Sequence, residues 1–385
     1  MAQRVGIVAV AQTKYEGSKP GLRMAELVHQ PVKEVLQQTG LKFTEDGSGI
    51  DFSICATDDF WDAMTLSDTP IGDVIGAHHR SAEKVSQDGA QAAIYATVAI
   101  LSGHYDTVLL VAHCKESQPS SRNLITNCAF CPVCTRILGV DYLSAAALQA
   151  KRYMYKYGIT REQCAKVSVK SYKNAKNNPY AQNAMDITVE DVLSSKMLAY
   201  PISVFDAYPV SDGACAMILA TEEKAKKLTD KPVWVKGVGN CYDCHHLGDR
   251  DLADCDSLEM AAKRTYKMAG IKNPRRNIDI AEISGQYSYQ ELLWSEGLGF
   301  CDRGEGGKFI DSGVTEMEGE LPINPSGGVL PGNPIIVAGL TRVVECVLQL
   351  KGEAGARQVA KAKTALAHGT TGPCGQLHSV LILGT

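Results

Sequence analysis

The feature that most constrains this chain is a pattern of elements that occurs once in each half. Residues 24–59 read as a helix, a turn at Thr39-Gly40-Leu41 and a strand, and residues 257–287 repeat this order around a turn at Ala269-Gly270-Ile271. Each half then continues with a glycine-bearing turn, an apolar helix rich in small residues and a late strand, over residues 86–112 and 332–383. Helices that alternate with strands predict an α/β fold in which helices cover the faces of mixed or parallel sheets.

A duplicated unit that pairs with itself has a pseudo-two-fold axis, and that axis would bring two helix N-termini together. The pattern puts these N-termini near Ser86 in the first half and near Asn333 in the second. The first turn of a helix has unpaired N–H groups and partial positive charge, so it suits carbonyl oxygens and oxyanions. We therefore expect the functional site at these two positions.

The composition limits the classes of protein to which the chain can belong. With 385 residues it can bury a large core and exceeds one ordinary domain. A formal net charge of −4 argues against a nucleic-acid surface, and no apolar run reaches the ~20 residues that span a bilayer. The apolar stretch near the N-terminus is too short for a signal peptide and is expected to form the first core strand, over residues 4–11. These observations predict a cytoplasmic protein of enzyme size, in which the 13 cysteines stay reduced.

One long segment differs in character from the rest of the chain. Residues 115–195 are polar, rich in Lys and Asn, and contain a cluster of cysteines, with helices expected over 143–157 and 161–177. We interpret this segment as an insertion that covers the core. The expected division is residues 1–118 with 196–228 for the first half, 119–195 for an inserted loop domain, and 229–385 for the second half.

Several short segments, taken together and in order, resemble one protein family. The most specific are Arg152–Thr160, Asn174–Ala181, Ile187–Leu193, Pro209–Ala214, Gly304–Gly307 and Leu321–Gly328. On these segments the chain is identified as a member of the thiolase superfamily, in its sterol-carrier-protein-type branch. The resemblance implies the thiolase fold, with duplicated βαβαβαββ halves in a five-layer α-β-α-β-α arrangement and an inserted loop domain.

The resemblance also implies a chemistry, the making or breaking of a carbon–carbon bond beside a thioester of coenzyme A. In the family a cysteine at the N-terminus of the buried helix takes the acyl group, and a histidine in a Gly-His-Pro turn activates it. A further turn holds an oxyanion water, and a C-terminal Cys or His moves a second proton. The matching positions here hold Ser86, Asn333 in Gly332-Asn333-Pro334, Ser284 in Ser284-Gly285-Gln286-Tyr287, and His368.

These replacements change what the site can do. A serine alcohol needs an adjacent base, and the amide of Asn333 does not titrate, so we predict His368 as the main proton-transfer group. Tyr287, Tyr289 and Tyr142 are further candidates, because a positioned tyrosine can act as an acid or base, as is proposed for aldolase relatives that cleave steroid side chains. The structural alternatives are a helix N-cap for Ser86, a loop histidine for His368 and packing for the tyrosines. The predicted catalytic set is His368, Ser86, Asn333, Ser284 and Tyr287.

Coenzyme A is expected as a substrate or product, without a tightly bound cofactor. By the resemblance, Gly89, Gly328, Thr370 and Gly372 lie along its binding path, with the pantetheine between the insertion and the core. Lys170, Lys173 and Lys176 are candidates for its phosphates, although a solvated helix face also explains them. The expected partners are a second copy of the chain, joined by edge pairing of the first-half sheets, and a small zinc-ribbon/OB-fold protein.

The cysteines carry two patterns that suggest a metal. They are Cys128-x-x-Cys131-x-x-Cys134 in the insertion and Cys241-x-x-Cys244-His245-His246 after a core strand. Neither pattern has a matching second pair at zinc-finger spacing within its own segment, so we predict no metal site and leave open that either segment binds an ion. Cys374 is an alternative thiol nucleophile, displaced from the family position.

We predict a thiolase-like enzyme subunit, an acyltransferase that cleaves or forms a carbon–carbon bond of a β-keto acyl-CoA, including an aromatic one such as the benzoylsuccinyl-CoA of anaerobic degradation. Two alternatives remain open. One is a retro-aldolase that acts on a CoA ester without an acyl-enzyme, and the other is a non-catalytic subunit that keeps the fold to shape a neighbour's active site.

Overall fold

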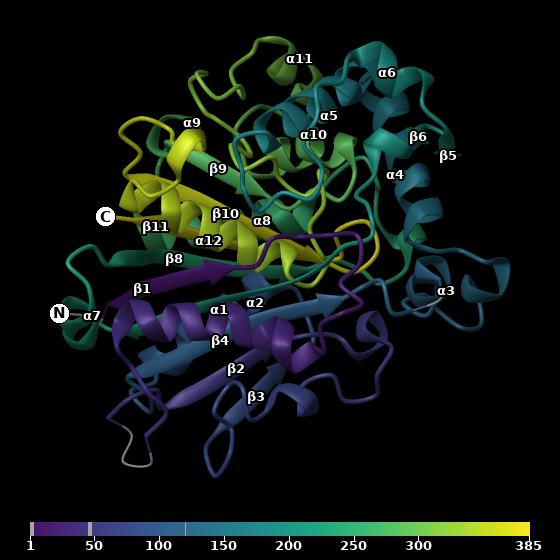
Figure 1. The fold of residues 1–385 in the computed structure, drawn as a ribbon. Helices are drawn as coiled ribbons and strands as arrows, with labels where there is room; N and C mark the ends of the chain where they lie inside the picture. Colours follow the sequence, from purple (N-terminus) through teal and green to yellow (C-terminus); the bar gives the residue numbers. More distant parts are fainter. Residues whose placement is uncertain (1–3, 45–47, 120) are drawn as a thin grey trace.

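The computed structural model describes residues 4–44, 48–119 and 121–385, and its centre is one nine-stranded sheet (Figure 1). In spatial order the strands are β3 (Ala82–Val85), β2 (Phe52–Ala56), β4 (Thr107–Lys115), β7 (Asp212–Thr221), β1 (Val5–Gln12), β8 (Val233–Tyr242), β11 (Leu377–Gly384), β10 (Thr364–Thr371) and β9 (Ile280–Ile283). β1 and β8 join the two halves through a short antiparallel pairing of Gly6 with Trp234 and Ile7 with Val233.

The predicted duplication is confirmed by the order of the strands. In the first half β2, β4, β7 and β1 lie side by side, and in the second half β9, β10, β11 and β8 lie in the same relative order. β2–β4 and β9–β10 are parallel, and the remaining neighbours within each set are antiparallel. The second-half counterpart of β3 is a single parallel bridge between Ala281 and Ile323.

The two repeated helices end in the same way. α1 (Met24–Thr39) is followed by Gly40 at φ 72°, and α8 (Asp256–Ala269) is followed by Gly270 at φ 71°. A left-handed residue after the last turn satisfies free helix carbonyls, and glycine adopts this conformation at little cost. The two glycine turns of the sequence repeat are therefore C-caps, and each sends the chain toward the strand that follows.

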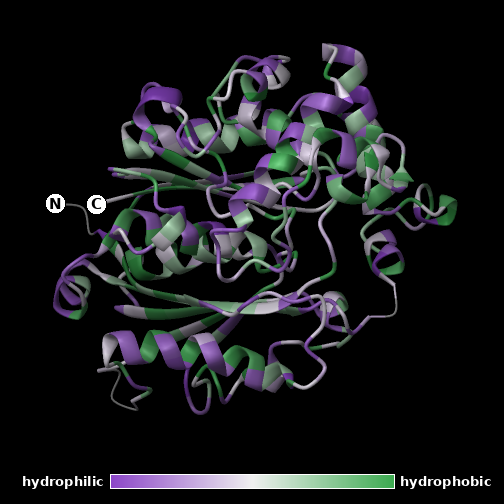
Figure 2. Ribbon diagram, turned by 45° about the horizontal axis from the view of Figure 1, so that its top comes forward, coloured by the Kyte–Doolittle hydropathy of each residue, from purple (hydrophilic) through white to green (hydrophobic). Residues whose placement is uncertain are grey.

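The helices and the two halves of the nine-stranded sheet form layers (Figure 2). α1 packs on the outer face of the first-half strands and α8 on that of the second-half strands, while α2 (Gly89–Leu101) and α12 (Ala338–Lys351) lie between them. α2 is apolar nearly all round, as expected for a helix that other elements cover on most sides. Gly89 makes the close approach of the central helices possible, since a Cβ added there would lie 2.5 Å from the Cβ of Leu340.

The predicted insertion forms a cap over one end of the layers. It contains α3 (Arg122–Asn127), α4 (Tyr142–Tyr157), α5 (Arg161–Ala175) and α6 (Val189–Ser194). The small hairpin of β5 (Met197–Ala199) and β6 (Ile202–Ser203) follows directly after its predicted end at residue 195. α5 packs against α10 (Ser288–Gly297) and α11 (Gly306–Asp311) of the second half. Short helices α7 (Glu222–Leu228) and α9 (Pro274–Asn277) complete the chain.

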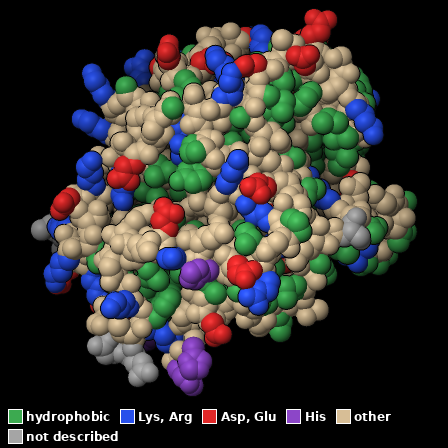
Figure 3. All heavy atoms as spheres, in the orientation of Figure 1, with side chains coloured by type: hydrophobic (Ala, Val, Ile, Leu, Met, Phe, Trp, Pro, Cys, Tyr) green, Lys and Arg blue, Asp and Glu red, His purple; other side chains and the backbone are tan. Residues whose placement is uncertain are grey.

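The surface carries charged side chains of both signs. On the face shown in Figure 3, basic and acidic side chains are interspersed rather than gathered by sign. Within the described ranges, no helix combines the length and the apolar character needed to cross a membrane. The polar surface and the large core both follow from the ordinary composition of the chain.

Candidate active site

A cavity lies where the insertion meets the ends of the core strands. Asp58 and Trp61 enter it from the segment after β2, and Tyr142 enters it from the first turn of α4. Tyr287 comes from the segment between β9 and α10. The end of β10 contributes Thr370 and Thr371, and the turn between β10 and β11 contributes Gly372, Cys374 and Gly375. Both halves of the duplication and the insertion thus contribute to one cavity.

Aromatic side chains make up much of the cavity wall. The rings of Tyr208 and Tyr287 meet edge to face at 5.9 Å, and the ring of Trp61 lies 6.3 Å from that of Tyr142. The Arg122 guanidinium lies 4.0 Å from the centre of the Tyr208 ring. Burial raises the pKa of the Tyr142 and Tyr287 hydroxyls above the ordinary value, so both are neutral hydrogen-bond donors near pH 7.

Asp58 is the acidic side chain of this wall. It lies two residues after β2, and it is partly exposed toward the cavity. Burial raises the pKa of its carboxyl group, against the opposing effect of the Phe60 backbone N–H. A carboxylate with a raised pKa is a stronger base than a free one. Asp58 is not among the residues predicted from the sequence, although an acidic residue two positions after a buried parallel strand is a signal that could have found it.

The N-termini of the central helices meet at a carboxylate. Asp88 caps α2 by accepting a hydrogen bond from the backbone N–H of Ala90 at 2.8 Å, and it accepts a second from the backbone N–H of Gly339 at 2.9 Å. Asp88 is fully buried, and burial raises its pKa to about 7. Two helix N-termini do meet, as the duplication predicts, but they lie at Gly89 and Ala338 and not at Ser86 and Asn333. The N-cap alternative for Ser86 is wrong, because α2 begins at Gly89 and Asp88 is its cap.

His368 lies in β10 and belongs to a buried pair. Its Nε2 is 2.9 Å from Nδ1 of His378 in β11, and the Trp294 ring packs against His378 at 4.7 Å. Burial lowers the pKa of His368 to about 3, and it lowers the pKa of His378 well below the ordinary value. Both imidazoles are therefore neutral at physiological pH. The second ring nitrogen of each has no hydrogen-bond partner among the described residues.

Comparison with known proteins decides the family. A family model described as the thiolase C-terminal domain-like family matches residues 239–385. The acetyl-CoA acetyltransferase of Methanothermobacter thermautotrophicus is 33% identical over 387 residues, which cover 97% of this chain and 98% of that protein. The chain belongs to the thiolase superfamily.

Further comparisons place this thiolase within the superfamily. Benzoylsuccinyl-CoA thiolase subunit BbsB of Thauera aromatica is 35% identical over 231 residues, which cover 59% of this chain and 60% of that subunit. Sterol carrier protein 2 of Oryctolagus cuniculus is 37% identical over 225 residues, which cover 57% of this chain and 41% of that protein. The predicted sterol-carrier-protein-type branch is confirmed.

The predicted thiolase fold is confirmed as well. The solved structure of the Ltp2–ChsH2(DUF35) aldolase superposes with a TM-score of 0.85 at 23% identity, covering 99% of this chain and 98% of that one. Together with the family assignment, this match identifies the nine-stranded sheet and its helix layers as the thiolase fold.

Of the predicted catalytic residues, one lines the cavity and four do not. Tyr287 lines the cavity, whereas Ser86, Asn333, Ser284 and His368 are not among the described residues that do so. Ser86 is exposed after β3, and Asn333 and Ser284 are fully buried. The Asn333 Oδ1 and the Ser284 Oγ have no hydrogen-bond partner in the part of the chain that the structure describes.

The residues predicted along the coenzyme A path also separate. Thr370 and Gly372 line the cavity, while Gly89 packs between the central helices and Gly328 lies in a buried turn at φ 73°. The prediction that Lys170 binds a phosphate is wrong, because its side chain is fully buried in an ion pair with Glu291. Lys173 is exposed, and Lys176 forms an exposed ion pair with Asp186.

Proposed function

We propose that this member of the thiolase superfamily breaks or forms a carbon–carbon bond beside a coenzyme A thioester by aldol chemistry, without an acyl-enzyme. The observation that carries the proposal is the content of the cavity. It holds a carboxylate, Asp58, beside two neutral phenols, Tyr142 and Tyr287. A base beside hydrogen-bond donors suits a reaction that removes one proton and stabilises one enolate.

The cleavage of a β-hydroxyacyl-CoA follows from these groups. The Asp58 carboxylate removes the proton of the β-hydroxyl group, and the electron pair of the O–H bond forms the carbonyl of the departing ketone or aldehyde. The bond between Cα and Cβ breaks, and its electron pair passes into the thioester enolate. The Tyr142 and Tyr287 hydroxyls donate hydrogen bonds to the enolate oxygen. The proton held by Asp58 then returns to Cα, which leaves a shortened acyl-CoA and the enzyme unchanged.

The surroundings of Ser86 do not support an acyl-serine. Ser86 is exposed, and no side chain that could act as its base is bonded to it among the described residues. The N–H groups that would suit an oxyanion are used by the chain itself, because Asp88 accepts from Ala90 and Gly339. Since serine needs both a base and an oxyanion site, we assign the chemistry to the cavity instead.

Acyl transfer is the second candidate, and Cys374 favours it. This cysteine lines the cavity in the turn between β10 and β11, at φ 54°. The named relatives that are acetyl-CoA acetyltransferases support the same candidate. Burial raises the pKa of the Cys374 thiol to about 12, against the opposing charge of Arg250, so almost no thiolate is present at pH 7. Acyl transfer would therefore need a base to activate this thiol.

We infer an aryl-bearing acyl-CoA as the substrate class. The aromatic wall formed by Trp61, Tyr142, Tyr208 and Tyr287 offers edges and faces that suit an aromatic ring. BbsB, a subunit whose name states an aromatic CoA substrate, is a relative of this chain. Lys173 and Lys176 are the remaining candidates for the phosphates of coenzyme A.

We also infer partners for this enzyme. The Ltp2–ChsH2(DUF35) aldolase is named as an assembly of two components, and BbsB is named as a subunit. By analogy, we propose a small zinc-ribbon/OB-fold partner. We further propose a homodimer that forms at the free edge of the sheet, where β3 is partly exposed, in the cytoplasm.

The test offers aryl-substituted β-hydroxyacyl-CoA esters, and separately β-ketoacyl-CoA esters with free CoA, to the full chain with and without a zinc-ribbon partner. Mass spectrometry should detect acyl-CoA and a free ketone or aldehyde from the hydroxy esters. Asp58→Asn and Tyr287→Phe should abolish this activity, while Tyr95→Phe on the exposed face of α2 should not change it. An acyl adduct on Cys374 or Ser86, or turnover of keto esters alone, would favour acyl transfer. No turnover in any combination would support the non-catalytic subunit.

A further inference from the structure

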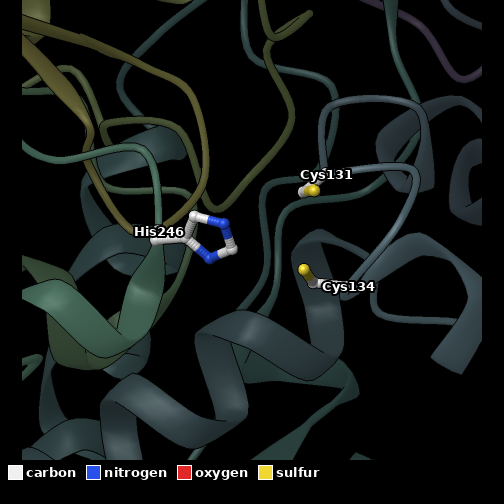
Figure 4. Close-up of side chains that lie close together, drawn as sticks. All are labelled: Cys131, Cys134 and His246. Carbon is white, nitrogen blue, oxygen red and sulfur yellow. The ribbon is translucent and has the colours of Figure 1, made fainter.

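Two cysteine-containing segments that are far apart in the sequence meet beside the insertion. Cys131 and Cys134 lie in the loop after α3, and His246 lies after β8, just before the short helix Leu247–Asp249. The two sulfur atoms and a ring nitrogen of His246 all lie within 4.8 Å of one another. Figure 4 shows the three side chains approaching one another from two loops, with the imidazole ring turned toward the cysteine side.

We propose that Cys131, Cys134 and His246 bind a zinc ion. Zinc is held in proteins by thiolates at about 2.3 Å and by imidazole nitrogens at about 2.0–2.1 Å, in a tetrahedral arrangement. Ligands at these distances lie roughly 3.5–4 Å from each other, so the side chains need only small movements to reach an ion. Water fills the fourth position.

The local backbone supports a metal-binding turn. Cys131-Pro132-Val133-Cys134 has the Cys-x-x-Cys spacing that is common in zinc sites, which lets two thiols of one turn reach the same ion. Cys128 and Cys244 complete the two sequence patterns but lie outside this group of described ligand atoms.

The loop that carries the cysteines has little else to hold it. Between Arg122 and Gly139 only Thr126 and Phe130 are buried. The side chains of Leu124, Val133, Ile137 and Leu138 are 66–75% exposed, and hydrophobic side chains gather at this edge of the molecule in Figure 3. A segment that buries so little apolar surface gains little stability from packing. A metal bond to His246 would tie it to the second half of the chain, as metals do in small folds.

The position of this loop matters for the cavity. Phe130 packs against Ala145 and Cys374, with Tyr142 and Leu247 beside it, and the rings of Phe130 and Tyr142 meet edge to face at 6.3 Å. The ion would therefore fix the wall that presents Tyr142. This positioning role rests on the proposed function, whereas zinc binding itself does not.

The experiment measures zinc in the full chain purified under reducing conditions, and then titrates the metal-free protein with Co²⁺. About one equivalent of zinc is expected, with cobalt showing thiolate charge-transfer absorption and the visible bands of a tetrahedral ion. Cys131→Ser, Cys134→Ser and His246→Ala should each weaken zinc binding at least 100-fold, more than the loss of an outer-shell partner. Cys301→Ser and His104→Ala, which lie elsewhere, should bind zinc as the parent does.

A structural readout completes the test. Zinc should slow hydrogen exchange of residues 122–140 in the parent protein and leave it unchanged in Cys134→Ser. Several results would overturn the proposal: no zinc taken up by the reduced protein, an octahedral cobalt spectrum, or ligand variants that bind as tightly as the parent. All of these readouts are taken without substrate, so they are independent of whether the aldol chemistry is correct.

Discussion

The two halves of the protein share one strand order but reach their central helices by different routes. In the first half three residues, Ser86 to Asp88, connect β3 to α2, and Ser86 is exposed. In the second half the strand shrinks to a bridge at Ile323, and residues 324–337 lead to α12 with every one of them buried. The shorter connection contains Asp88, which caps both helices, because α12 has no side-chain cap from its own half.

The comparison also shows where each half contributes to the cavity. Asp58 follows β2 and Tyr287 follows β9, and these two strands hold equivalent positions in the duplication. The ends of the two repeated segments therefore both reach the cavity, with a carboxylate from one copy and a phenol from the other. At the helix N-termini, by contrast, the N–H groups of Ala90 and Gly339 are bonded to Asp88.

The largest expected effect is on kcat, and it distinguishes Asp58 at the end of β2 from Ser86 before α2. Asp58→Asn keeps the size of the side chain but removes the base, so kcat should fall roughly 10²–10⁴-fold. Ser86→Ala should change kcat less than threefold. Steady-state kinetics on a β-hydroxyacyl-CoA measures both, and equal losses in the two variants would contradict the assignment of the chemistry to the strand ends.

The second expected effect is on how the free energy of unfolding depends on pH, and it comes from Asp88, which caps both central helices. The pKa of Asp88 is about 7 in the folded protein and near 4 when unfolded, so the folded state binds more protons between these values. The free energy of unfolding should therefore decrease as pH rises from 4 to 7, by up to about 1 kcal/mol per pH unit from this group. Denaturant unfolding of Asp88→Asn should lack this contribution, while the exposed Asp186→Asn should keep it. Parallel pH profiles for the parent and Asp88→Asn would show that Asp88 is not the group responsible.

The packing of the two central helices can be tested at Gly89. Gly89→Ala places a methyl group against the Leu340 backbone and side chain, and overpacking of this kind costs about 1–3 kcal/mol. Gly248→Ala, with open space around the new Cβ, is the matched control and should be close to neutral. Thermal unfolding compares the two. If Gly89→Ala leaves the thermal unfolding temperature unchanged, the two central helices can move apart slightly without loss of stability.

The smallest effect is expected at Ser86 itself. Its side chain is exposed and does not cap α2, so Ser86→Ala should change the free energy of unfolding by less than about 0.5 kcal/mol. Urea unfolding is sensitive enough to detect the loss of about 1 kcal/mol expected for a true N-cap. A loss of that size would show that Ser86 supports the helix in a way that the contacts of Asp88 do not reveal.

The duplication and the buried helix could be predicted from the sequence, because each depends on local pattern and on the chemistry of nearby residues. The glycine turns at Gly40 and Gly270 marked the ends of both repeated helices. The predicted N-terminus Ser86 lies two residues before the observed cap Asp88, since both residue types are good caps. The contact of Asp88 with Gly339 is the feature that links the cap to the other half. Short-range pattern does not contain such a contact.

The cavity could be predicted only in part, for a related reason. Tyr287, Thr370 and Gly372 were named from the family resemblance, and they do line it. Asp58 was missed, because its importance comes from lying beside Tyr142, 84 positions away in the chain by their residue numbers. The same applies to Cys134 and His246, which belong to patterns that are incomplete within their own segments and meet only in the folded chain.

The shared carboxylate has a consequence for how the molecule opens. Because the Asp88 carboxylate accepts hydrogen bonds from the first turn of both central helices, an opening that displaces this side chain breaks a contact of each helix at once. The amides of Ala90 and Gly339, one in each half, should therefore exchange their hydrogens with deuterium at similar rates and through one common opening. A protein that arose from two copies would in this respect unfold as a single cooperative unit.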